Sequence, residues 1–234
     1  MFRPESNLNS LTTLGAVKPA IYRAGGVAAL TIGVAYLIII ALYASVGLPP
    51  TGGEAWLQYL EGKTQAWWAI VGISVFTNFL FVPIALAFYF ALRDINRIAM
   101  LIGVAFIGLF VVLELAVNWA GYAALLVLSK QYAATATASE RALFIAAAHY
   151  PAAVIASPLA LVYAIGTLSF GFLVIGWVMR QGVFNQLTAY VGIVTGLLGL
   201  AAVAGVSLAI ILNAVFATLW LFLVGARLCR LVQE

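Results

Sequence analysis

Charged side chains are scarce in this sequence, and their scarcity excludes an ordinary soluble domain. Asp, Glu, Lys and Arg make up 8% of the 234 residues, whereas apolar residues make up 65%. A soluble domain carries about 25% charged residues, which it needs to cover a water-facing surface. A chain with so few charges is therefore predicted to be surrounded by lipid.

Cysteine and histidine are almost absent as well. The single cysteine, Cys229, excludes an internal disulfide and a cysteine-based metal framework. The single histidine, His149, excludes a bis-histidine haem site or a histidine metal cluster. There is no phosphate-binding glycine loop between a strand and a helix, and the net charge of +4 is not gathered in any basic run. The sequence thus predicts no cofactor, no metal site and no nucleic-acid partner.

Long apolar blocks are what the sequence has instead. A helix needs about 20 apolar residues to cross a ~30 Å hydrocarbon core, and the short alternating strands of a membrane β-barrel do not occur. These blocks predict an all-α bundle of six transmembrane helices in a single membrane domain, residues 1–234, whose cytoplasmic N-terminal segment is residues 1–20. The predicted spans are residues 21–46, 66–92, 98–128, 153–179, 187–204 and 207–226.

The fifth and sixth blocks run almost without a break. Residues 187–226 would measure about 60 Å as one helix, which is twice the bilayer core. We therefore predict a tight reversal of the chain near Gly205.

Two segments between the blocks are long enough to have structure of their own. Residues 51–65 are predicted to be a polar loop, since they contain Glu54, Glu61 and Lys63. Residues 133–150 are predicted to contain a short helix, because Thr137 and Glu140 have the spacing of a capping box. The apolar face of that helix favours a position in the outer membrane interface.

Basic residues predict the orientation of the chain. If the N-terminus lies inside, three basic residues lie outside, namely Lys63, Lys130 and Arg141. The positive-inside rule then favours a multi-pass membrane protein with both termini in the cytoplasm. The basic residues on the inside are Arg3, Lys18, Arg23, Arg93, Arg97, Arg180, Arg227 and Arg230.

Small residues form stripes on two of the predicted spans. Helix association in lipid depends on close backbone approach, for which small residues are needed. We predict that these stripes pack helices within the chain; the alternative is the interface of a homo-oligomer or of a complex with other membrane subunits. The residues are Ala160, Ala164 and Gly171 on the fourth span, and Gly192, Gly196 and Gly199 on the fifth.

Glu114 is the residue most indicative of function. A carboxylate in the middle of a span is costly if it faces lipid, so it is expected to face the bundle interior, to have a partner or to be protonated. Asn118 and Tyr122 follow at helical spacing on the same face. Together with polar residues at similar depth they predict a binding pocket, and the alternative is a structural hydrogen-bond network. The predicted pocket residues are Glu114, Asn118, Tyr122, Asn78, Asn213 and His149. For His149 the alternative is an interfacial side chain bonded to water or backbone.

Several short motifs resemble a bacterial six-span membrane family known as domain of unknown function 4386. They are residues 22–26 (YRAGG), 35–40 (AYLIII), 89–97 (YFALRDINR), His149 and 182–184 (GVF). The resemblance covers about residues 20–228. It implies six spans and a bacterial inner membrane, and it supplies no substrate or reaction.

The function predicted from these patterns is that of a non-catalytic binding or accessory subunit of a membrane complex. The alternative is a small-solute or proton-coupled transporter that uses the pocket around Glu114. An enzyme is not expected, because no acid, base and nucleophile can converge: the sole Asp, Asp94, and the sole His, His149, are predicted on opposite sides of the membrane.

Overall fold

The computed structural model describes the backbone of residues 5–233 and the side chains of residues 19–233, and in this part of the chain it contains helices and turns but no strand. Six segments are long and apolar enough to cross a membrane, which confirms the predicted six-span all-α bundle. They are Pro19–Val46, Thr64–Leu92, Arg97–Ala134, Pro158–Met179, Gln186–Val203 and Ser207–Arg230.

Two of the six spans are not regular α-helices. The third consists of α4, a π-helical segment η1 and α5, and the fourth consists of α7, a second π-helical segment η2 and α8. Each of the other spans is one helix or lies within one. The elements are α1 (Glu5–Val46), α2 (Gly53–Tyr59), α3 (Thr64–Leu92), α4 (Arg97–Leu113), η1 (Glu114–Trp119), α5 (Ala120–Ala134), α6 (Ala138–Ala156), α7 (Pro158–Leu161), η2 (Val162–Gly166), α8 (Thr167–Met179), α9 (Gln186–Val203) and α10 (Ser207–Arg230).

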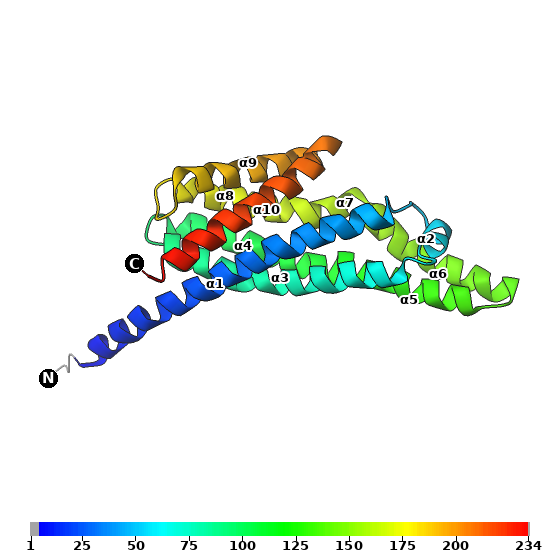
Figure 1. Cartoon of the computed structure of the whole chain (residues 1–234), viewed down its shortest axis with the longest axis horizontal. Coiled ribbons are helices and arrows are strands. Elements are labelled where there is room, and N and C mark those ends of the chain that lie inside the picture. The colour runs from blue at the N-terminus through cyan, green and yellow to red at the C-terminus, as the bar shows by residue number, and fades with distance from the viewer. Residues whose placement is uncertain (1–4, 234) are drawn as a thin grey trace.

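The bundle has two unlike ends (Figure 1). At one end α5 and α6 form an antiparallel helical hairpin with α2 beside it, and we call this the hairpin end. At the other, which we call the basic end, α1 packs at Gly26 against the last turns of α10, and the arginines that flank the spans lie at this end. These are Arg23, Arg93, Arg97, Arg180, Arg227 and Arg230.

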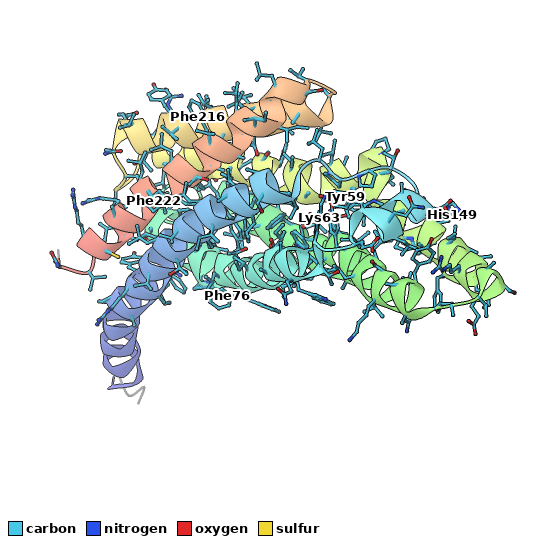
Figure 2. All side chains as sticks on the ribbon, turned by 45° about the vertical axis from the view of Figure 1, so that its right-hand side comes forward. Tyr59, Lys63, Phe76, His149, Phe216 and Phe222 are labelled. Atoms are coloured by element: carbon cyan, nitrogen blue, oxygen red, sulfur yellow. The ribbon has the colours of Figure 1, made fainter. Side chains whose placement is uncertain are left out.

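Close backbone approach joins the first and last spans near the basic end. A methyl group on Gly26 would come within 3.1 Å of the Gly225 carbonyl oxygen, and one on Gly33 would come within 2.9 Å of the Phe222 ring. Phe222 is labelled in Figure 2. Apolar side chains gain little free energy when they move from lipid to protein, so close contacts of this kind supply much of the driving force for helix association.

The reversal predicted near Gly205 is confirmed. Gly205 has φ of +97°, which favours glycine, and the Val206 amide donates to the Ala201 carbonyl across the turn. The chain thus turns back within three residues, and α9 and α10 pack side by side.

The prediction of a polar loop over residues 51–65 is wrong. This segment contains α2, whose Trp56 and Leu57 are buried, as is Leu60 just after it. Glycines at positive φ, Gly52 and Gly62, flank the helix and let the chain fold it back onto the bundle.

The helix predicted within residues 133–150 exists but is longer and lies elsewhere. The Thr137 hydroxyl accepts the Glu140 amide at 3.3 Å and donates to the Glu140 carboxylate at 2.8 Å, which caps α6 as predicted. The helix then continues through Pro151 to Ala156. It runs alongside α5, not across the end of the bundle (Figure 1).

Candidate functional site

A cavity of about 370 Å³ lies between five of the six spans, in the half of the bundle nearer the hairpin end. Most of its wall is apolar, with a small number of polar groups among the apolar ones, as is typical of small-molecule sites. Its lining residues are Tyr36, Ile39, Ile40 and Tyr43 of α1; Ser74, Thr77 and Asn78 of α3; Phe110, Glu114 and Trp119 of the third span; Ala164, Ile165 and Leu168 of the fourth; and Ile210, Asn213, Ala214, Ala217 and Thr218 of α10.

Glu114 is the only carboxylate on this wall and is 4% exposed. Its Oε1 accepts a hydrogen bond of 2.6 Å from Asn118 Nδ2, which also donates to the Ala160 carbonyl at 3.2 Å. Asn118 therefore orients the carboxyl and ties the third span to the fourth. Among the described residues that line the cavity there is no Lys or Arg, so the chain places no countercharge there.

The π-helical segment η1 changes which residues share the Glu114 face. A π turn takes one residue more than an α turn, so residues beyond it are rotated relative to the face predicted from α-helical spacing. Asn118 still bonds Glu114, but Tyr122 does not line the cavity. Tyr122 instead stacks on Trp67, with ring centroids 5.3 Å apart.

Aromatic rings close the cavity toward the hairpin end. We call this group the aromatic cap; two of its members, Tyr43 and Trp119, also line the cavity. Trp67 is at its centre and contacts the rings of Tyr43 and Trp56 at 5.6 and 5.2 Å. The cap consists of Tyr43, Trp56, Tyr59, Trp67, Trp119 and Tyr122.

A second set of rings closes the cavity toward the basic end. Phe110 lines the cavity and lies edge-on to Phe81 at 5.3 Å. Phe81 contacts Phe172, which in turn contacts Trp220 at 4.3 Å. These side chains belong to the largest buried cluster, so the cavity does not continue through it.

The cavity is open at its side, between α1 and α10. Two lining residues are exposed, and they belong to these two helices: Ile40 is 43% and Ile210 37% exposed. The helices that meet at Gly26 and Gly225 near the basic end thus both border a cavity toward the hairpin end. The exposed rim is apolar, and water has no polar group to bind there.

The other polar side chains on the cavity wall differ in whether their donors have hydrogen-bond partners. Asn78 is 3% exposed and its Nδ2 has no hydrogen-bond partner in the part of the chain that the structure describes. Asn213 Nδ2 donates to the Thr195 carbonyl at 2.8 Å. The hydroxyls of Thr77 and Thr218 donate to carbonyls of their own helices. The Asn78 Nδ2 donor therefore lies at the cavity without a hydrogen-bond acceptor among the described residues.

His149 is a third predicted pocket residue, after Asn118 and Tyr122, that does not line the cavity. It is exposed on α6 at the hairpin end (Figure 2). The backbone of Ala148 and His149 packs against Gly53 of α2, and His149 lines a surface pocket with the first residues of α2, away from the cavity around Glu114. Among residues 19–233 no three His, Cys, Asp or Glu side chains lie together to hold a metal ion.

The glycines of the predicted small-residue stripes meet other helices of the same chain. Gly192 lies against the Trp220 indole, which donates from Nε1 to the Thr188 carbonyl at 2.9 Å. Gly196 and Gly199 contact Leu173 and Ser169 of α8. In the fourth span a methyl group on Gly171 would come within 3.0 Å of the Gly103 carbonyl oxygen of α4. The Ala160 carbonyl accepts from Asn118, and Ala164 lines the cavity.

Several lining residues were not predicted from the sequence. Ser74 precedes Asn78 by four residues and Thr77 follows Ser74 by three, so both had a signal in their spacing. Trp119 had none, because it lies five residues after Glu114 and reaches the cavity through the π turn. Ile40 and Ile210 had none, since an apolar residue at a cavity rim resembles any other lipid-facing residue. Compared with protein-family models, with curated proteins and with solved structures, the chain shows no match in any of the three.

Proposed function

We propose that this protein is a non-catalytic membrane protein that binds a small lipid-soluble molecule, which reaches the cavity sideways from the bilayer between α1 and α10. The observation that carries the proposal is the shape of the cavity. It has the volume of a small-molecule site and is closed by aromatic rings at both ends, while its open side is bordered by the exposed Ile40 and Ile210. A water-soluble ligand would have to pass the aromatic cap.

We further propose that the basic end faces the cytoplasm and that the membrane is a bacterial inner membrane. The first proposal rests on the arginines at that end and the positive-inside rule. The second rests on the resemblance of the YRAGG and YFALRDINR segments to a bacterial family.

Filling the cavity tests the proposed binding function. Ala214 lines the cavity on α10, and a Phe at this position would occupy part of it. Ala105 of α4 is exposed, and the same substitution there adds a ring on the outside of the bundle. Native mass spectrometry of protein released from lipid nanodiscs is expected to show a bound small molecule on the unmodified chain and on Ala105→Phe. The bound mass is expected to be absent from Ala214→Phe. Equal retention by both variants would refute binding in this cavity.

A further inference from the structure

The charge balance of the cavity points to the chemistry of its ligand. Glu114 is buried on the wall, and Asn118 is its one hydrogen-bond donor among residues 19–233. A carboxylate without a countercharge is unfavourable in a low-dielectric site, much more so than a neutral amide without a partner. The group that would benefit most from a ligand is therefore Glu114.

Aromatic rings line the same space. Tyr36, Tyr43, Phe110 and Trp119 all line the cavity together with Glu114. The negative face of an aromatic ring attracts a cation, and the attraction grows when the pair is shielded from water. One carboxylate among four rings is a suitable setting for an organic cation, whereas an anionic ligand would find no basic group on this wall.

The lateral opening limits which cations can reach the site. The molecule has to be apolar enough to cross the rim at Ile40 and Ile210. Asn78 adds an amide that is nine-tenths buried and lines the cavity. Its nitrogen has no hydrogen-bond partner among the described residues, so this donor is available to a ligand. A ligand with a polar end could use it.

We propose that the cavity binds lipophilic organic cations, with the positive charge at the Glu114 carboxylate and among the rings of Tyr36, Tyr43 and Trp119. This inference rests on the proposed binding function and specifies its ligand class. A proton and the cation compete for the same carboxylate, so the cation binds more tightly as the pH rises.

Other titratable groups do not complicate this competition. Those near Glu114 are the hydroxyls of Tyr36 and Tyr43 on α1 and of Tyr122 on α5. Tyrosine hydroxyls remain protonated below about pH 9. Among the described residues, α3, α4, η2, α8 and α10 contribute no titratable side chain to the cavity wall.

A pair of probes that differ only in charge tests the proposal. Decyltrimethylammonium is the cation, and a decyl group that ends in tert-butyl instead of trimethylammonium is its uncharged isostere. Binding of radiolabelled decyltrimethylammonium is measured by equilibrium dialysis against nanodiscs of uncharged phosphatidylcholine, with empty nanodiscs subtracted. We expect saturable binding that is tighter at pH 8 than at pH 6 and is not displaced by the isostere.

Glu114→Gln is the matched variant, because a Gln oxygen can still accept from Asn118. It is expected to weaken binding by about 30-fold or more and to remove the pH dependence. Displacement of the probe by the isostere, or unchanged binding in Glu114→Gln, would overturn the cation assignment. The displacement experiment uses the unmodified chain, so its result does not depend on whether a variant folds.

The failure of this inference can be told apart from the failure of the proposed function. If Ala214→Phe, but not Ala105→Phe, loses saturable binding of the uncharged isostere, the cavity is a ligand site and the cation assignment is wrong. If neither probe binds saturably to the unmodified chain, and native mass spectrometry finds no bound molecule, both proposals are wrong.

Discussion

Single glycines determine how closely the spans of this bundle approach. Gly192 faces the Trp220 indole, and an added methyl group would come within 2.6 Å of Trp220 Nε1. That nitrogen donates to the Thr188 carbonyl, so moving the indole would also break an interhelical hydrogen bond. Gly72 of α3, in contrast, has no atom of another residue within reach of a methyl group.

Gly192→Ala is expected to lower the free energy of unfolding by about 1–3 kcal/mol, because overpacking forces Trp220 to move. Gly72→Ala is the control and is expected to be neutral or slightly stabilising, since Ala favours a helix more than Gly does. Unfolding by added SDS in detergent micelles, followed by circular dichroism, measures both. Equal effects of the two substitutions would show that Gly192 has no special packing role.

Sequence reasoning at the residue scale succeeds where lipid imposes a large cost. Glu114 was predicted to face inward because exposure to hydrocarbon is unfavourable, and the structure places it, Asn78 and Asn213 on one cavity wall. It fails for Tyr122, because a π turn cannot be read from residue spacing. It fails for His149, because an exposed histidine at the hairpin end costs nothing and leaves no signal.

One element outside the spans, α2, helps to close the site through the aromatic cap. Three charged side chains, Glu54, Glu61 and Lys63, lie in or near α2, but Trp56, Leu57 and Leu60 are buried against the bundle. Glycines and charges in residues 51–65 suggested a loop, and the apolar face of a seven-residue helix is too short to give a periodic pattern. Trp56 is 2% exposed and joins the aromatic cap.

Trp56→Ala is expected to cost about 3–5 kcal/mol of unfolding free energy, as is usual when a large buried ring is removed. It is also expected to weaken the near-ultraviolet circular dichroism signal of the aromatic cap. Trp68 offers a control, since it is 44% exposed on the outside of α3 and its removal leaves no cavity. Thermal unfolding in detergent that affected Trp56→Ala and Trp68→Ala equally would contradict the packing of α2 against the bundle.

At the scale of the whole molecule, an even number of spans places both chain ends at the basic end (Figure 1). The sequence also predicted that both ends lie on one side, because the lengths of the apolar blocks give the number of spans and the basic residues independently indicate the side of each connecting segment. Arg3 lies outside the described residues, as does the side chain of Lys18. What sequence could not supply is how the helices tilt apart around a cavity, which depends on contacts among side chains distant in sequence.

Labelling of introduced cysteines tests the orientation. In a Cys229→Ala background, Glu61→Cys lies at the hairpin end and Asp94→Cys, at a position 77% exposed, lies at the basic end. A membrane-impermeant maleimide added to bacterial spheroplasts is expected to label Glu61→Cys while the spheroplasts are intact, and Asp94→Cys only after they are permeabilised. The reverse order would invert the proposed orientation, and labelling of both from one side would contradict the six-span arrangement.

The reversal at Gly205 has a consequence for biogenesis. Residues 181–226 carry no charged side chain, so α9, the turn and α10 offer the insertion machinery no ionic group to translocate. The two helices can enter the bilayer together as a preformed pair, in which the polar backbone of the turn is already largely hydrogen-bonded. We expect Arg180 before the pair and Arg227 after it to hold both ends of the pair at the same leaflet, so that these two arginines set the orientation of the last two spans.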